Sequence, residues 1–299
     1  LHSALPSAPL IVADSPLFFQ AEDGIRDRSP SRGLGDVYKR QLLNRCVFKA
    51  KPSTGLQLYT LRDLMSVNPR KTLEYVAKVG YKELETAGYS EGKMYGLDPS
   101  EFHAIVTDLG MTMVSGHISF KDLKSDWGRV LQMLEDTGQK YVVFPYLEES
   151  ERNLEIYHEV IELLNEKSAE LRQLNKVMAY HNHAFEFESI DGVVPMELLL
   201  KETDAEVVDF ELDIYWAVKA GASVLDLFKK YKNRFSLWHV KDMNLAGNFT
   251  EVGNGVIDFQ EIFDQSQEAG MQHFFIEQDQ SVNPEKSIAT SFQNLQGLL

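Results

Sequence analysis

Strand-like and helix-like segments alternate along the chain from Gly55 onward, and this alternation is the strongest constraint on the fold. Short apolar and aromatic runs are each followed by a segment in which apolar residues recur at helical spacing. Such alternation predicts parallel strands joined by right-handed helical crossovers. The sequence predicts strands over 55–61, 81–88, 111–119, 140–146, 176–183, 207–216, 235–242 and 273–279.

The segments between these strands predict helices, some of them with clear start signals. Asn68 with Pro69, and Asp98 with Pro99, suit helix N-termini. Segment 59–65 lacks the Gly-rich phosphate turn of a doubly wound sheet, whereas alternating units in about 250 residues fit a single (β/α)₈ TIM barrel. Helices are expected over 69–79, 98–110, 122–137, 151–174, 195–203, 221–231 and 258–270, and from Pro284 to the end.

The N-terminal segment 1–41 is interpreted as a non-native extension. Gln20–Asp27 and Ser31–Gln41 match, in order and in frame, the translations of a sequencing flow-cell adapter and a transposon-type read primer. Acidic residues in the segment also argue against a transit peptide. We therefore expect residues 1–41 to form a disordered, adapter-derived extension and residues 42–299 to form the barrel catalytic domain.

Composition restricts the partners of the chain. The 45 acidic and 30 basic residues give a net charge of −15, which argues against nucleic acid and anionic membranes. The sequence lacks a run of 18 apolar residues that would predict a membrane span. The single Cys46 excludes an intramolecular disulfide. A small neutral ligand fits this composition, homo-oligomerisation is left open, and the cytoplasm is slightly favoured over the periplasm.

Ionisable side chains gather at the predicted C-terminal strand ends, where TIM barrels carry their reactive groups. Because side chains alternate along a strand, His181 and His183 lie on the same face of their strand, and His239 and Lys241 lie on the same face of theirs. Apolar neighbours suit the helix-facing side, so the polar faces are expected to point into the barrel mouth. The full set is Glu85, His117, His181, His183, Asp213, His239, Lys241, Glu277 and Asp279.

Four of these residues predict a metal site, because His181, Asp213, His239 and Glu277 end four consecutive strands. Imidazoles combined with carboxylates suit Mn²⁺, Co²⁺, Fe²⁺ or Zn²⁺ better than Mg²⁺ or Ca²⁺. Singly, each residue has a structural interpretation as a hydrogen-bonded histidine, a cap or a salt-bridge partner. Their convergence favours the metal site.

Other residues have weaker signals. Glu211 shares the strand face of Asp213 and is expected lower in the barrel, with catalytic and structural roles equally open. Trp216 could stack on a sugar as a substrate-binding residue or simply pack. Arg62 reads as part of a surface pair, and Gly253 and Gly255 indicate either close approach to a ligand or a tight turn.

Together, several of these motifs resemble the sugar phosphate isomerase/epimerase family of xylose-isomerase-like barrels. The resemblance covers Gly55 to about Glu285. It is carried by LQLYTLRD (56–63), VGYKELETAGY (79–89), SGHIS (115–119), YHNHAFEF (180–187), FELDIYWAVKAG (210–221), HVKD (239–242) and FIEQD (275–279).

The resemblance implies one divalent metal, most often Mn²⁺, held by the four strand-end residues. It places His117 and Lys241 where the family commonly faces its substrate, and Glu85 as a further mouth residue. Many epimerases of the family have Glu where this chain has His181, and exchange a proton between two metal-bound glutamates. Here Glu277 remains of that pair, so the candidates for further catalytic groups are Glu211, His183 and Lys241, and one-base chemistry stays open.

The first functional hypothesis is a metal-dependent isomerase or epimerase that acts on a keto-sugar, sugar acid or cyclic polyol through an enediolate. The alternative is a metal-dependent lyase or dehydratase that eliminates from a 3-keto-glycoside or an inosose. The acidic charge and the absence of an Arg and Lys cluster at the mouth argue against a phosphorylated substrate. An abasic-site endonuclease would need a basic DNA-facing surface, and a non-catalytic sugar-binding protein remains a remote alternative.

Overall fold

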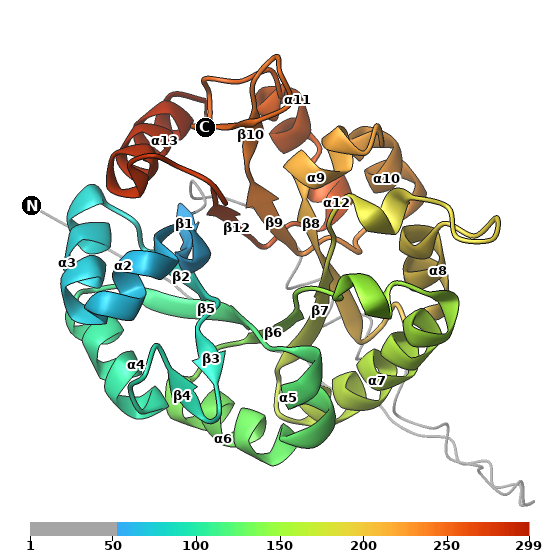
Figure 1. Cartoon of the computed structure of the whole chain (residues 1–299), viewed down its shortest axis with the longest axis horizontal. Coiled ribbons are helices and arrows are strands. Elements are labelled where there is room, and N and C mark those ends of the chain that lie inside the picture. The colour runs from blue at the N-terminus through green and yellow to red at the C-terminus, as the bar shows by residue number, and fades with distance from the viewer. Residues whose placement is uncertain (1–52, 299) are drawn as a thin grey trace, which may run out of the picture. The chain divides into compact units, whose positions relative to one another are not determined.

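The described residues of the computed structural model, 53–298, fold into a closed ring of eight parallel strands (Figure 1). This confirms the predicted TIM barrel. The ring follows chain order, and β1 pairs with both β2 and β12 to close it. Its strands are β1 (Gly55–Gln57), β2 (Glu83–Thr86), β5 (Thr112–His117), β6 (Tyr141–Phe144), β7 (Val177–His181), β8 (Val208–Asp213), β9 (Leu237–Val240) and β12 (His273–Ile276).

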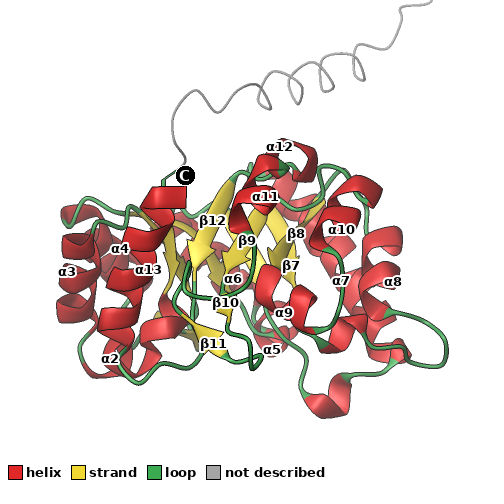
Figure 2. Ribbon diagram, turned by 90° about the horizontal axis from the view of Figure 1, so that it is seen from above, coloured by secondary structure: helices red, strands yellow, loops and turns green. Residues whose placement is uncertain are grey.

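Helices surround the strands on the outside, and the view turned by 90° also shows the strands at the centre (Figure 2). Among the described residues, no helix is long and apolar enough to cross a membrane. The predicted extension 1–41 and the domain start at residue 42 lie outside the described residues. The helices are α2 (Arg62–Val67), α3 (Pro69–Val79), α4 (Pro99–Asp108), α5 (Phe120–Ser125), α6 (Trp127–Thr137), α7 (Leu154–Gln173), α8 (Pro195–Glu202), α9 (Ile214–Lys219), α10 (Val224–Lys230), α11 (Phe259–Asp264), α12 (Ser266–Ala269) and α13 (Pro284–Leu298).

Short elements at the strand ends interrupt the predicted alternation. Strand 55–61 was expected to be continuous, but after three residues it turns into the 3₁₀ helix η1 (Leu58–Leu61). Two further 3₁₀ helices, η2 (Glu149–Glu151) and η3 (Phe185–Phe187), lie in later loops. Two hairpins also form, β3 (Tyr89–Ser90) with β4 (Lys93–Met94) and β10 (Asp242–Met243) with β11 (Phe249–Thr250).

The core has two apolar clusters, one between the barrel and the helices and one inside the barrel, and their positions show which strand side chains face the mouth. Outward residues of the strands, such as Leu212, Trp238 and Ile276, belong to the large core between barrel and helices. Inward residues of the lower barrel form a smaller apolar cluster that includes Ala179, Leu237 and Phe275. Two residues further along the same strands the inward positions hold His181, His239 and Glu277. The predicted inward direction of the polar face is therefore confirmed.

Several predicted boundaries were wrong for identifiable reasons. The predicted strand 207–216 ends at Asp213, because the Asp213 side chain accepts a hydrogen bond from the Trp216 amide and caps α9. Trp216 is thus helical. Helix 122–137 breaks at Asp126, where φ is −137°, and helix 258–270 breaks at Gln265.

Candidate metal centre

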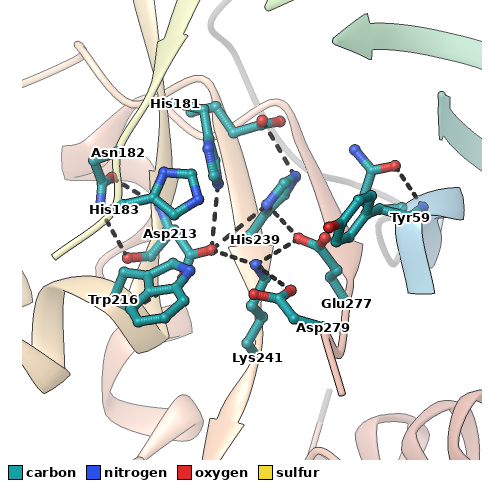
Figure 3. Close-up of polar contacts among 12 residues, drawn as sticks. Tyr59, His181, Asn182, His183, Asp213, Trp216, His239, Lys241, Glu277 and Asp279 are labelled. Carbon is teal, nitrogen blue, oxygen red and sulfur yellow. Dashed lines mark hydrogen bonds and ion pairs between the residues drawn. The ribbon is translucent and has the colours of Figure 1, made fainter. Parts of the chain in front are cut away.

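The four residues predicted as metal ligands lie together at the mouth. His181 ends β7, Asp213 ends β8, His239 lies in β9, and Glu277 follows β12. One donor atom from each lies within 4.8 Å of the others, and all four residues are buried (Figure 3). We call these four residues the upper group.

The nitrogen and oxygen atoms of the upper group lie close together, but two of them lack well-directed hydrogen bonds. His181 Nε2 lies 3.3 Å from Asp213 Oδ2, and His239 Nδ1 lies 2.7 Å from Glu277 Oε2. Yet His239 Nδ1 and Glu277 Oε2 are buried without a hydrogen bond of acceptable geometry. Buried polar atoms nearly always make well-directed hydrogen bonds, so converging ligand atoms that lack them fit a bound metal ion.

Neighbouring groups orient the upper group. His181 Nδ1 lies 3.0 Å from the Pro145 carbonyl, so it carries the proton and leaves Nε2 free to coordinate. Asn182 accepts from the Asp213 amide at 3.0 Å and donates to its carbonyl at 3.3 Å. Asp213 Oδ1 accepts from the amide of Trp216, which leaves Oδ2 for the site. These contacts fix two side chains before any ligand arrives.

Lys241 places an ammonium group among three carboxylates (Figure 3). Its Nζ lies 2.9 Å from Asp213 Oδ2, 2.8 Å from Glu277 Oε2 and 2.7 Å from Asp279 Oδ1. Burial opposes the charge, but these carboxylates hold the pKa of Lys241 well above its usual value. Burial raises the pKa of Asp213 and Glu277, but the nearby charge of Lys241, together with the neighbouring histidines, holds both pKa values well below the usual range. The lysine is therefore charged at neutral pH.

A second set of residues lies deeper, below the His239 ring. His117 Nε2 lies 3.0 Å from Glu211 Oε2, and His239 Nε2 lies 2.5 Å from Glu85 Oε2. Burial raises the pKa of Glu211 to about 7 and lowers the pKa of His117 to about 3. Burial and then Glu211 raise the pKa of Glu85. We call Glu85, His117 and Glu211 the deep group.

His181 and Glu277 of the upper group and His117 of the deep group line a cavity of about 940 Å³. One wall is aromatic. The His183 and Phe185 rings stack 5.5 Å apart, and the Trp216 ring lies 5.6 Å from both His183 and Phe249. His183 Nδ1 and Trp216 Nε1 are buried on this wall without a hydrogen-bond partner. A sugar presents apolar C–H faces and hydroxyls, and both could be satisfied here.

The mouth also carries cations that the sequence analysis did not place there. Arg62 was interpreted as part of a surface pair, but it lines the cavity with its guanidinium 4.4 Å from the Tyr59 ring centre. Arg152 lines it as well and stacks 3.7 Å from the Phe185 ring centre. The prediction that the mouth lacks an Arg and Lys cluster was therefore wrong, because Arg62 and Arg152, from a helix and a loop after the strands, join Lys241 in lining the cavity.

A buried carboxylate fixes the loop that carries Phe249. Asp242 accepts hydrogen bonds from the amides of Met243, Gly253, Gly255 and Ile257. A Cβ at Gly255 would lie 2.1 Å from Asp242 Oδ1, so this position requires glycine. Of the two interpretations of the loop glycines, the structure supports the tight turn.

The structure brings together nearly all of the predicted site residues. His183 lies beside the upper group, with its ring 4.7 Å from that of His181, and is held by its amide hydrogen bond to Glu186. Lys241, Trp216 and His117 line the cavity, while Glu85 and Glu211 lie beneath it. Tyr59, Tyr146, Phe185 and Phe249 also line the cavity and were missed. The YHNHAFEF motif offered a signal for Phe185, because it continues directly from His183.

Comparisons with known proteins agree with the barrel fold. The family described as xylose isomerase-like TIM barrel matches residues 73–298. A solved sugar phosphate isomerase/epimerase from Parabacteroides distasonis is 26% identical, with a TM-score of 0.72 over 84% of this chain and 96% of that one. The solved IOLI protein with a binding zinc atom is 14% identical, with a TM-score of 0.63 over 82% of this chain and 97% of that one, and shows the shared fold.

Two inosose dehydratases are similar in sequence. The one from Geobacillus thermodenitrificans is 30% identical over 129 residues, which are 36% of this chain and 43% of that protein. The match therefore spans less than half of that relative. The one from Geobacillus kaustophilus is 23% identical over 236 residues, 64% of this chain and 74% of that protein. Because the family match spans most of the described barrel, this chain belongs to the xylose isomerase-like TIM barrel family.

Proposed function

We propose that this protein is a divalent-metal-dependent sugar isomerase or epimerase that acts next to a carbonyl through an enediolate. The observation that carries the proposal is the upper group, whose four donor atoms converge within 4.8 Å below the cavity. The cavity's aromatic wall and unpartnered polar atoms suit a keto-sugar, sugar acid or cyclic polyol.

His181, Asp213, His239 and Glu277 would hold the ion. Their two imidazoles and two carboxylates suit Mn²⁺, the first choice, and also Co²⁺, Zn²⁺ or Fe²⁺. When bound, such an ion polarises a carbonyl and makes the neighbouring C–H more acidic. A zinc atom in a protein of the same fold supports a metal of this class.

The protonation states of Lys241 and His183 indicate different roles for these two side chains in the proposed reaction. Lys241 is held protonated, so it stabilises negative charge that develops on substrate oxygens and does not act as a base. Burial lowers the pKa of His183 well below its usual value, so this ring is neutral, and its unpartnered Nδ1 is available to hydrogen-bond a substrate hydroxyl. Glu211 contacts His117, which lines the cavity, and this pair could pass a proton to the mouth.

Elimination of water is the second candidate function. Two curated relatives are inosose dehydratases, and His181 stands where a second carboxylate would permit exchange from two faces. One base suffices for a dehydratase or a lyase, because the same enediolate then expels a leaving group.

Proton exchange in D₂O separates the candidates. The protein is incubated with Mn²⁺ and a panel of keto-sugars and inososes, and NMR follows the C–H next to the carbonyl. An isomerase or epimerase yields deuterated isomers, a dehydratase yields an unsaturated product, and a sugar-binding protein yields neither. Absence of exchange across the panel, with or without added Mn²⁺, would contradict the proposal.

A further inference from the structure

We propose that the substrate of this site carries a carboxylate and that Arg152 binds it. The inference rests on the proposed function and narrows it, because it selects the sugar acids from the keto-sugars, sugar acids and cyclic polyols that the cavity suits. Arg152 follows η2 in the loop before α7 and lines the cavity. It belongs to neither the upper group nor the deep group, so its role is separate from the metal centre.

The guanidinium group of Arg152 is held in place by its neighbours. It lies 3.7 Å from the centre of the Phe185 ring and 5.1 Å from the centre of the Tyr146 ring. Its Nε donates to the Leu147 carbonyl at 3.1 Å, and its Nη2 donates to the Tyr146 hydroxyl. A guanidinium group that is already stacked and hydrogen-bonded loses little freedom when it binds an anion.

Arg152 lacks an acidic partner in the described part of the chain. Two of its five guanidinium N–H groups donate within the protein, which leaves three for a ligand. Glu148 and Glu188 also line the cavity, but neither forms an ion pair with it, and the Glu148 side chain caps η2. The exposed Arg172, by comparison, pairs with Glu206. In a chain with 45 acidic and 30 basic residues, an unpaired arginine at the cavity fits a site that an anionic ligand completes.

Arg152 lies one aromatic ring away from the side chains beside the upper group. The Tyr146 ring, which its guanidinium contacts, lies 5.0 Å from the His183 ring, and that ring lies 4.7 Å from the ring of His181. The Phe185 ring also stacks on His183. A substrate whose carbonyl reaches the upper group can therefore run along these rings and place its far end at Arg152. A carboxylate at the end of the carbon chain, away from the reacting carbon, fits this arrangement.

The surroundings of Arg152 favour a carboxylate over a phosphate. The planar guanidinium group matches a carboxylate through two parallel N–H bonds. A phosphate ester carries more negative charge, and the exposed carboxylates of Glu148 and Glu188 line the same cavity and would repel it more strongly. The other cavity arginine, Arg62, follows β1, which is three positions from β6 in the ring. A single arginine on this side of the mouth suits the single charge of a carboxylate.

Matched ligands test the inference. Fructose, fructuronate and fructose 6-phosphate share the C2 carbonyl and differ at C6, which is a hydroxymethyl group, a carboxylate or a phosphate ester. Tagatose, tagaturonate and tagatose 6-phosphate form a second series with the opposite configuration at C4. Calorimetry measures the affinity of each ligand for the full chain loaded with Mn²⁺. In at least one series, the wild-type protein should bind the acid at least about 10-fold more tightly than the neutral sugar.

Substitutions at Arg152 then show whether this residue causes the preference. Arg152→Gln should weaken binding of the acid by about 10-fold or more and leave binding of the neutral sugar nearly unchanged. Arg152→Lys keeps the charge but loses the planar fork, so it should retain only part of the preference. Arg172→Gln is the matched control, because Arg172 is exposed at the other end of α7 and pairs with Glu206. It should keep the full preference.

Three results would overturn the inference. They are wild-type protein that binds neither acid more tightly than its neutral sugar, tighter binding of the phosphate than of the acid, and an acid preference that survives Arg152→Gln. An equal loss of affinity for acid and neutral sugar in Arg152→Gln would likewise contradict it, because a structural role would have that effect. The D₂O experiment is independent: exchange without an acid preference contradicts only the role of Arg152, and an acid preference without exchange contradicts only the proposed function.

Discussion

Single residues set the chemistry of this mouth through burial and charge. Asp213 shows how much one side chain does: Oδ1 caps α9, and Oδ2 faces the upper group and Lys241. The sequence predicted the polar residues of the site because strand ends in a TIM barrel converge. It missed Phe185, Phe249 and Arg152, because loop and helix side chains reach the cavity by paths that strand periodicity does not encode.

Glu277→Gln tests the assigned role of Glu277. The substitution keeps the shape but removes a charge that would bind the metal, so turnover should fall at least about 100-fold. Ligand affinity, measured by calorimetry, should fall much less. Glu149→Gln, an exposed change in η2, is the control and should leave both unchanged. Equal losses in affinity and turnover would instead assign Glu277 to substrate binding.

Glu186 gives a prediction on stability and pH. Burial raises its pKa to about 7, while Tyr180 Oη donates to it at 2.8 Å. The folded state thus keeps a proton that the unfolded chain loses above its ordinary pKa of 4.5. This contribution is intact below pH 4.5 and is lost as pH rises to 7, by roughly 3 kcal/mol.

Glu186→Gln should remove that loss. Urea unfolding between pH 4.5 and 8 should show the variant gaining stability over wild type as pH rises, with the gain levelling off near pH 7. Parallel stability profiles for the two proteins would refute a titrating Glu186.

At the scale of elements, the sequence signals for helix starts predicted the structure better than the predicted lengths of helices and strands did. Helix α3 begins at the predicted Pro69, and the Asn68 side chain accepts from the Lys71 amide. The same signal at Asp98 and Pro99 predicted the start of α4, but Asp98 makes no capping hydrogen bond and instead pairs with Lys93. The sequence does not reveal this choice, because Lys93 lies in a hairpin that periodicity did not predict.

These two caps can be compared directly. Asn68→Ala should lower the free energy of unfolding by about 1 kcal/mol, because it leaves a helix amide without its partner. Asp98→Ala should cost less, since it removes an exposed ion pair of small value. Denaturant unfolding of both variants measures the difference. A larger loss for Asp98→Ala would show that the ion pair with Lys93 stabilises the protein more than the Asn68 cap does.

At the scale of the whole molecule, the closed barrel is what brings the site together. Residues as distant in sequence as Glu85 and His239 meet because β2 and β9 lie in one ring. The alternation of strands and helices predicts that ring. The sequence does not give the depth of each residue, which depends on strand stagger, so the division into upper and deep groups emerges only from the fold.

Metal binding should therefore stabilise the entire barrel. An ion that binds only the folded state adds about 2.7 kcal/mol at a concentration 100 times its Kd. Mn²⁺ or Zn²⁺ should raise the melting temperature of chelator-treated protein, and Asp213→Asn should reduce the shift. An unchanged melting temperature in calorimetry, at saturating metal, would mean that the ion does not bind the folded state in preference to the unfolded chain, and would contradict the metal site.

The turn over residues 242–257, which Asp242 holds together, limits how the ligand specificity of the mouth can change. Four amides converge on one carboxylate, and a glycine must stand where a side chain would collide with it. The backbone path beside Phe249 is thus prepared before a ligand arrives, so binding loses little conformational entropy on that side. New specificity on this edge should arise by exchanging side chains such as Phe249, while insertions and deletions within the turn should be poorly tolerated.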